Sequence, residues 1–404
     1  MDSVRDTVLS PLQLRNLTLP NRLIRSATYE GLADPDGFPL AELGALYAGL
    51  AAGGVGTIIT GFAYISREGR AMHPAQCGID SDDKISAWKQ VVDRAREASL
   101  TTRLIMQIAH TGRQTKQRAT GSQVVGASRK PCTYFKERTT PLDDTGIRTV
   151  VSQFADAAHR AMVAGFDGVQ IHAAHGYLIH QFLSPWTNTR IDQWSNRALL
   201  LVEVILAIRR TCGPSFPILV KLSEAEDNAP GIRLPDTIET AKLLERLEID
   251  AVEISYGTME NALNIIRGGV PIDVVLAVNP MFNRFPPAVK SIWKRLCYPA
   301  YARKLIPFAE DYNLDAAARV KREAGIPVIA VGGIRSLRSI NKIISEGLAD
   351  AVALCRPLVC EPELPSQIAN GEFIRSRCVN CNLCTIYCDS NWPLRCYHKK
   401  GTDL

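Results

Sequence analysis

The chain has 404 residues, of which 46% are hydrophobic and 22% are charged. This composition is typical of a globular protein that buries a large core, and it excludes a largely disordered chain. The formal net charge of +6 comes from 47 basic and 41 acidic residues. Because these charges are interspersed, they do not indicate a nucleic acid or a membrane as a partner.

The chain begins with MDSVRDTVLSPLQLRN, which lacks the basic and apolar segments of a signal peptide, and no run of about 18 apolar residues follows. We therefore expect a cytoplasmic protein. Five of the eleven cysteines lie in the last 27 residues. The others are scattered, as reduced thiols of a cytosolic protein are. They are Cys77, Cys132, Cys212, Cys297, Cys355 and Cys360.

Short runs of β-branched and aliphatic residues alternate with stretches that carry apolar residues at helical spacing. The predicted strands are 22–26, 55–60, 104–108, 168–172, 218–222, 251–255, 328–331 and 351–354. The predicted helices are 41–53, 84–99, 150–165, 196–212, 236–248, 315–325 and 337–347. Repeated strand-helix units predict an α/β fold with a parallel sheet. Eight such units, without an early G-x-G-x-x-G fingerprint, favour a closed (β/α)8 TIM barrel over an open sheet.

We expect one barrel domain over residues 1–375 and a Cys-rich tail over residues 376–404. Two long insertions interrupt the barrel pattern, at 114–146 and 257–312. Both follow strands, on the face where barrel enzymes keep their substrate loops. They are therefore expected to shape a pocket, although long surface loops are also tolerated without a function.

Polar residues and glycines collect at the ends of several predicted strands, which is where a barrel enzyme builds its site. Thr28, Gly61, Gln107, His172, His175, Lys221, Gly332, Gly333 and Arg356 are in such positions. Backbone N–H groups at a glycine turn can bind a phosphate together with a guanidinium on the next strand. The pair Gly332–Gly333 with Arg356 fits that description, although a glycine pair alone is more often a plain turn.

The segment 168–177, GVQIHAAHGY, places two imidazoles and a phenol at the end of one strand. Neutral imidazoles can donate two hydrogen bonds to one oxygen, and a nearby phenol can deliver a proton to carbon. A metal site is an alternative, but no Asp, Glu or Cys follows at ligand spacing. A purely structural histidine pair is the other alternative.

These motifs together resemble the old yellow enzyme family of FMN-dependent ene-reductases. The matching segments, in the order of the family, are SPLQL at 10–14, NRLIRSAT at 21–28, QIAHTGR at 107–113, HAAHGYLIHQFLSP at 172–185, VGGI at 331–334 and RPL at 356–358. The resemblance implies an NAD(P)H-dependent flavin oxidoreductase that reduces the activated C=C bond of an enone or enal, with NADH or NADPH as the reductant.

The resemblance also implies roles for individual residues. Ser26, Ala27, Thr28, Gly61, Gln107 and Lys221 would surround the flavin, and Gly332, Gly333, Cys355 and Arg356 would hold its phosphate. His172 and His175 would bind the substrate carbonyl, and Tyr177 would protonate the α-carbon. Three features depart from most relatives. Lysine replaces arginine at 221, cysteine replaces glycine at 355, and the loop 190–197 is shorter.

Cys378, Cys381, Cys384 and Cys396 resemble the [4Fe–4S] ligands of the dienoyl-CoA reductase and trimethylamine dehydrogenase branch. The residues around Thr28 resemble the same branch. Zinc could use the same four thiols. Because the chain ends at Leu404, without the nucleotide-binding domains that the cluster serves in that branch, we expect a metal-free tail.

The alternative with a cluster is an iron–sulfur dehydrogenase or dienoyl reductase-like enzyme. A second rival is a flavin-free barrel lyase that uses Lys221 as a Schiff-base amine. The sequence leaves open whether the chain forms a homo-oligomer.

Overall fold

The structure is a computed structural model that describes residues 2–398. Within this range, eight parallel strands close a barrel, because the last strand pairs with the first through Ala353 and Ile24. The strands are β3 (Leu23–Arg25), β4 (Thr57–Ile59), β6 (Arg103–Ala109), β9 (Gly168–Ala173), β10 (Ile218–Ser223), β11 (Ala251–Ser255), β12 (Val328–Val331) and β13 (Ala351–Leu354). The predicted (β/α)8 TIM barrel is therefore confirmed.

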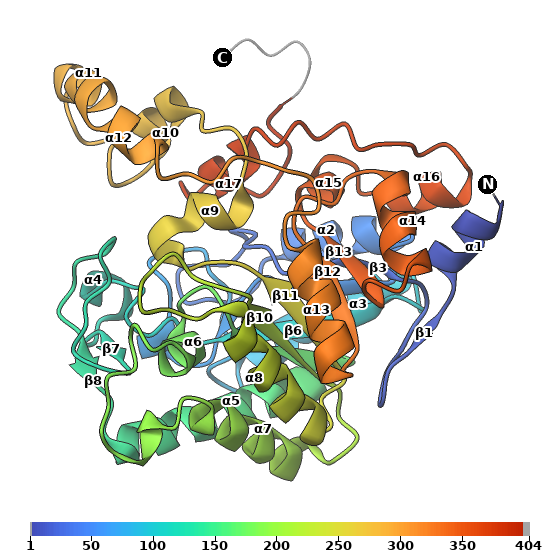
Figure 1. The fold of residues 1–404 in the computed structure, drawn as a ribbon, viewed down its shortest axis with the longest axis horizontal. Coiled ribbons are helices and arrows are strands. Elements are labelled where there is room, and N and C mark those ends of the chain that lie inside the picture. Colours follow the sequence, from blue (N-terminus) through green and yellow to red (C-terminus); the bar gives the residue numbers. More distant parts are fainter. Residues whose placement is uncertain (1, 399–404) are drawn as a thin grey trace.

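Helices pack around the outside of this barrel (Figure 1). They are α2 (Ala41–Ala52), α3 (Lys84–Ala98), α5 (Asp144–Val163), α7 (Leu199–Cys212), α8 (Leu234–Arg246), α13 (Leu314–Ala324) and α14 (Leu337–Ser345). Helix α5 starts six residues before its predicted start, because Asp143 caps it by accepting a hydrogen bond from the Gly146 N–H at 2.8 Å. The last residues of the first insertion, which the sequence predicts as a loop, thus already belong to helix α5.

The barrel interior changes from apolar to polar along the strands. Inward-facing Ile105, Leu219 and Ala251 form an apolar layer, which a hairpin of β1 (Leu12–Gln13) and β2 (Thr18–Leu19) covers from below. Because side chains on one face of a strand recur every second residue, Gln107, Lys221 and Glu253 form the next layer above them. The sequence therefore places a polar layer at the carboxyl ends of the strands, where the site lies.

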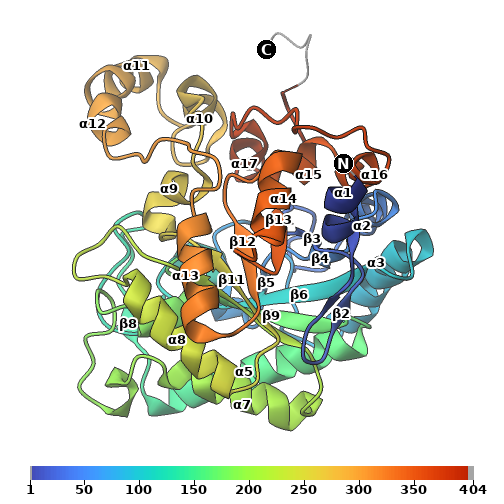
Figure 2. The ribbon, with the colours of Figure 1, turned by 45° about the vertical axis from the view of Figure 1, so that its right-hand side comes forward.

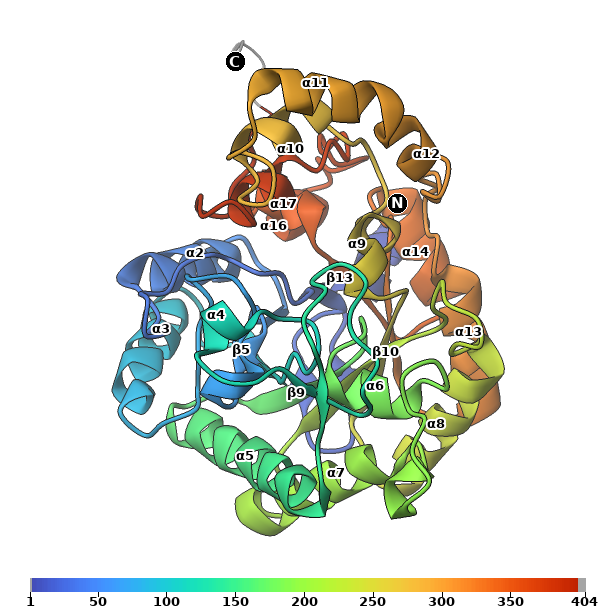
Figure 3. The ribbon, with the colours of Figure 1, turned by 90° about the vertical axis from the view of Figure 1, so that its left-hand side faces the viewer.

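Both insertions lie above the carboxyl ends of the strands (Figure 3). The first contains α4 (Gln117–Thr120) and a short parallel pair, β7 (Val125–Gly126) and β8 (Thr140–Pro141), which were not predicted because two-residue strands carry no periodicity. The second contains η3 (Met259–Asn261), α9 (Ala262–Ile266), α10 (Ile272–Val278), α11 (Pro287–Leu296) and α12 (Tyr298–Ala302). A buried ion pair of 2.7 Å between Arg113 and Glu260 links the start of the first insertion to η3.

The Cys-rich tail packs against the barrel. After α15 (Arg356–Cys360) and α16 (Leu364–Ala369), the chain returns over the strand ends and forms α17 (Leu383–Cys388), which lies beside α10 (Figure 2). The Leu394 N–H donates to the Glu30 carbonyl oxygen at 3.0 Å. The tail is thereby placed over the barrel mouth. Among the helices that the structure describes, none is long and apolar enough to cross a membrane.

The remaining described elements are short. α1 (Asp2–Leu9) precedes the bottom hairpin, and β5 (Ala63–Tyr64) extends the sheet beside β6. η1 (Arg67–Gly69) follows β5, whereas α6 (Leu178–Leu183) and η2 (Gln193–Ser195) lie between β9 and α7. The sharp connection from β9 to α6 is the one that matters for the site.

Candidate active site

A large pocket opens at the carboxyl ends of the barrel strands. It encloses about 1420 Å³, counting the open solvent at its mouth. The residues predicted from the sequence that line it are Ser26, Ala27, Thr28, Gln107, His172, His175, Tyr177, Lys221, Gly332, Gly333, Cys355 and Arg356. Residues that are hundreds of positions apart in the chain therefore converge on one cavity, as the strand-end pattern predicts.

Gly61 is the predicted residue that does not line this pocket. Its N–H donates to Glu30 Oε1 at 2.8 Å, and a Cβ at position 61 would lie 2.0 Å from Glu30 Oε2. The structure therefore places Gly61 behind the pocket wall, where the lack of a side chain makes room for Glu30. Glu30 itself forms a buried ion pair with Arg25 at 2.9 Å.

A buried polar network forms the pocket floor. Glu253 accepts hydrogen bonds from Lys221 Nζ at 3.0 Å and from Ser26 Oγ at 2.6 Å. Its second oxygen accepts from Gln170 Nε2 at 2.7 Å, and Gln170 Oε1 in turn accepts from Gln107 Nε2 at 2.7 Å. The carboxylate thus orients both amides, and Gln107 Oε1 is the atom left to face the pocket.

His172, His175 and Tyr177 form one aromatic cluster on the pocket wall. The ring centroids of His172 and His175 are 5.0 Å apart, and those of His172 and Tyr177 are 4.6 Å apart. Burial lowers the pKa of both histidines well below the ordinary value. Burial also raises the pKa of Tyr177, so the phenol keeps its proton. The cluster therefore consists of neutral imidazoles beside a protonated phenol.

The hydrogen bonds of His172 identify its proton-bearing nitrogen. The Ala174 N–H donates to His172 Nδ1 at 3.3 Å, so the proton of the neutral ring lies on Nε2. His175 Nε2 is 2.8 Å from Ser255 Oγ at the end of β11. His172 thus offers one N–H donor that its own backbone does not use.

A strained turn carries the cluster. His175 has φ of +59° and Gly176 has φ of +77°, so two consecutive residues adopt the left-handed conformation. The His175 carbonyl accepts hydrogen bonds from Gln114 Nε2 at 2.7 Å and from the Met259 N–H at 2.9 Å. One donor comes from each insertion, so the two insertions together hold the turn that positions Tyr177.

Another group of pocket residues is suited to bind a phosphate. Gly332 and Gly333 have φ of +127° and +77° and follow β12, and Arg356 follows β13. Arg356 Nη1 is held by the Arg267 carbonyl at 2.8 Å and by Asn382 Oδ1 at 2.6 Å. The guanidinium is therefore fixed in place, with its other N–H groups left for an anion.

The sequence analysis missed several pocket residues, of which some belong to the second insertion and the tail and others follow or end barrel strands. They are Tyr29, Phe62, His73, Ser255, Met259, Ala262, Leu263, Ile265, Ile266, Tyr312, Asn313, Asn380, Thr385, Ile386 and Asp389. His73 stacks on Tyr29 with ring centroids 4.7 Å apart, and its Nε2 lies 3.8 Å from Asp389 Oδ1. Burial raises the pKa of Asp389. No motif in the sequence connects these positions.

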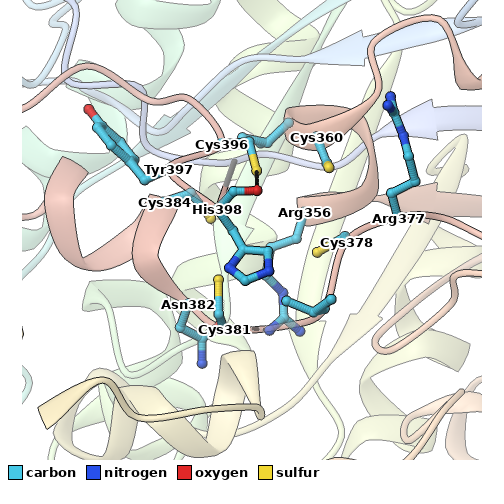
Figure 4. A pocket seen from close by; sticks show the side chains of 12 residues that line it. Arg356, Cys360, Arg377, Cys378, Cys381, Asn382, Cys384, Cys396, Tyr397 and His398 are labelled. Carbon is cyan, nitrogen blue, oxygen red and sulfur yellow. Dashed lines mark hydrogen bonds between the residues drawn. The ribbon is translucent and has the colours of Figure 1, made fainter. Parts of the chain in front are cut away.

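A second hollow lies next to the first and shares Arg356 with it (Figure 4). Cys360, Cys378, Cys381, Cys384, Cys396 and His398 are among the residues that surround it. Burial raises the pKa of Cys360 and of Cys384 to about 12. Within residues 2–398, no three Cys, His, Asp or Glu side chains are placed to bind a single metal ion. The tail thiols therefore gather around one space without converging on one point.

Comparison with known proteins places this geometry in a family. Residues 7–267 match the NADH:flavin oxidoreductase / NADH oxidase family. The chain is 30% identical to an NADH oxidase of Thermoanaerobacter brockii over 92% of this chain and 52% of that protein. It is 31% identical to an NADPH dehydrogenase of Geobacillus thermodenitrificans over 89% of this chain and 93% of that protein. The chain therefore belongs to the NADH:flavin oxidoreductase / NADH oxidase family.

The likeness extends to solved structures. An old yellow enzyme homologue from Zymomonas mobilis matches with a TM-score of 0.69 at 23% identity, covering 95% of this chain and 99% of that one, which shows a common fold. The chain spans about half the length of the curated relatives that it matches first, 52% and 50% of them. The family model supports FMN as the cofactor, and NADH and NADPH are the reductants in the names of these relatives.

The polar groups that line the pocket match the chemical groups of FMN. Lys221 offers a cation, with one N–H that its hydrogen bonds to Ser26 and Glu253 do not use, and Arg356 offers a guanidinium. Asn313 lines the same pocket, and its buried Oδ1 has no hydrogen-bond partner in the part of the chain that the structure describes. A free acceptor there suits a hydroxyl donor such as those of a ribityl chain. A phosphate, a polyol and a polar ring would each meet matching groups.

Proposed function

We propose that this protein is an FMN-dependent NAD(P)H oxidoreductase that reduces the activated C=C bond of α,β-unsaturated carbonyl compounds. The observation that carries this proposal is the cluster of His172, His175 and Tyr177 on the wall of the flavin pocket. When bound, reduced FMN supplies a hydride to the β-carbon of the alkene. The substrate is an enone or enal.

The histidines would stabilise the negative charge that develops on the carbonyl oxygen. A neutral imidazole donates a hydrogen bond through its single N–H, and His172 has this N–H on Nε2, as its Nδ1 contact indicates. A hydrogen-bond donor that is already in place lowers the barrier to hydride transfer, because its hydrogen bond to the oxygen strengthens as negative charge forms there. His172 therefore binds and polarises the substrate, and His175 would bind the same oxygen through the ring nitrogen that does not contact Ser255.

Tyr177 would supply the proton that completes the reduction. The reaction adds one hydride to the β-carbon and one proton to the α-carbon, while NAD(P)H becomes NAD(P)⁺ and solvent restores the phenol proton. Because burial raises the pKa of Tyr177, its hydroxyl is protonated at neutral pH and can act as a general acid. Tyr177 thus acts as the proton donor to carbon, whereas His172 acts as the hydrogen-bond donor to the carbonyl oxygen.

The test separates the two half-reactions. The purified protein should be yellow, lose its flavin absorbance with NADH or NADPH, and recover it with cyclohexenone. In Tyr177→Phe we expect unchanged bleaching, while recovery with the enone slows by about 10²–10⁴-fold. Recovery with dioxygen, which needs no proton on carbon, should stay as in the wild type. Recovery with the enone at the wild-type rate in this variant would contradict the role of Tyr177.

A second candidate keeps the fold and adds a [4Fe–4S] cluster, which would make the protein an iron–sulfur dehydrogenase or a dienoyl reductase-like enzyme. The gathering of Cys378, Cys381, Cys384 and Cys396 around one hollow favours it, since thiolates on different iron atoms need not converge on one point. The cluster would accept single electrons. Anaerobic purification should then yield iron and acid-labile sulfide, about four of each per chain. Absence of both would end this candidate and leave the first intact.

A further inference from the structure

Residues 274–309, here called the basic arm, hold the excess charge of the protein. This segment contains Arg284, Lys290, Lys294, Arg295, Arg303 and Lys304, and it contains no acidic residue. These six charges equal the net charge of +6, so the rest of the chain has as many basic as acidic residues. Among residues 2–398, the only ion pair of the arm joins Lys294 to Asp273 at 2.6 Å. Charges of both signs are interspersed over the rest of the chain, whereas the basic arm is one block of positive charge.

The same arm exposes an apolar stripe. Val289, Ile292 and Leu296 are 46%, 59% and 68% exposed, and Phe285, just before α11, is 41% exposed. At helical spacing, the three residues of α11 lie within about 60° of one another around the helix axis. Helix α11 has no buried residue within the described chain. The stripe thus has no partner in this structure.

Cations lie on both sides of this stripe. Lys290 falls on one flank of α11 and Arg295 on the other, by the same helical spacing. Long basic side chains beside an apolar face can extend their charged ends to a polar boundary while their stems cover apolar surface. Trp293 packs against Phe282 with ring centroids 5.2 Å apart, which holds the helix to the rest of the arm.

The helices α11 and α12 of the arm stand away from the barrel (Figures 1 and 3). The chain of the arm leaves from α9, whose Leu263 and Ile266 line the pocket, and it returns at Tyr312 and Asn313, which line it as well. Helix α11 packs against α12 at the outer end. The arm is therefore connected at both of its ends to the pocket wall.

We infer that the basic arm docks on an anionic lipid membrane surface, with the apolar stripe of α11 in the headgroup region. An amphipathic helix with cations beside an exposed apolar face has this property, because burial of the stripe and attraction to anionic lipid add together. A second copy of this chain would bring the same positive charge to the contact. A nucleic acid would match the charge and leave the apolar stripe exposed. This inference does not depend on the reaction in the pocket.

The test uses the full-length flavoprotein and sedimentation with vesicles of phosphatidylcholine, with or without about 30% phosphatidylserine. Binding should require phosphatidylserine and weaken with salt, because exposed charges are screened at high ionic strength. The variant Lys290→Gln/Arg295→Gln should lose about fivefold in partitioning for each charge removed. The variant Ile292→Ser/Leu296→Ser should lose about tenfold or more, because the stripe no longer gains by burial.

The matched controls lie outside the arm, on α7 and α8, which are far from α11 in Figure 1, and at Leu100 after α3. Arg210→Gln/Arg246→Gln removes two exposed charges from α7 and α8, and Leu100→Ser removes a side chain that is 79% exposed. Both controls should bind vesicles as the wild type does. Equal binding to neutral vesicles, or loss of binding in the controls, would overturn the inference. So would a dimer that Ile292→Ser/Leu296→Ser converts to a monomer without any vesicle binding.

Discussion

The substitution Glu253→Gln probes the polar floor of the pocket. Glu253 is fully buried and accepts from Lys221, Ser26 and Gln170. A glutamine has one acceptor and one donor, so in either orientation its amide N–H group faces one of these donors. The Lys221 ammonium also loses its charged partner at 3.0 Å. Removing one member of a buried ion pair costs about 3–5 kcal/mol of unfolding free energy.

The measurement is urea unfolding of the wild type, Glu253→Gln, Lys221→Met and the double variant Lys221→Met/Glu253→Gln. Each single variant leaves one buried charge unpaired, whereas the double variant leaves none. We therefore expect the double variant to lose less unfolding free energy than the two single variants combined. Additive losses, or a loss below about 1 kcal/mol in Glu253→Gln, would refute the coupling that this geometry implies.

Three further expectations concern other parts of the protein. Arg356→Gln should weaken FMN binding about 10- to 100-fold and leave riboflavin binding unchanged, because riboflavin has no phosphate. Burial lowers the pKa of His110 to about 3, so the unfolded chain binds a proton there that the folded chain does not. Wild-type stability should therefore fall from pH 5.5 to 4.5 by about 1.4 kcal/mol more than that of His110→Asn, in parallel urea titrations. Asp389 lines the pocket, and its carboxylate repels a negatively charged substrate. Asp389→Asn should therefore lower the KM of an enone that carries a carboxylate about tenfold, while the KM of a neutral enone stays similar.

The barrel was predictable because strands and helices in it have strong local patterns. The run 218–222 is aliphatic except for Lys221, and the structure forms β10 (Ile218–Ser223) there. The hairpin of β1 and β2 was not predictable, because its strands have two residues each and its closure depends on fit to the barrel bottom. Periodicity finds elements that repeat, and it misses elements that only tertiary contacts define.

The predicted site depended on one geometric rule, that the carboxyl ends of parallel strands meet at one edge. This rule brought Gln107, Lys221 and Arg356 to one pocket although they are far apart in the chain. It could not place Asp389 there, because that residue follows α17 in the tail and has no strand end to mark it. It also could not show that Glu253 neutralises Lys221, because a glutamate inside a strand pattern has no visible partner in the sequence.

Arg356 connects the flavin pocket with the cysteine hollow. Its guanidinium is bound by Asn382, which lies between Cys381 and Cys384 and which also donates to the Gly269 carbonyl at 3.0 Å. Any event that reorders these thiols therefore acts on the group that would hold the flavin phosphate. Coupling between two sites is reciprocal, so a ligand that favours this position of Arg356 would in turn favour this arrangement of the tail. The tail is in this sense a part of the flavin site, whether or not it carries a cluster.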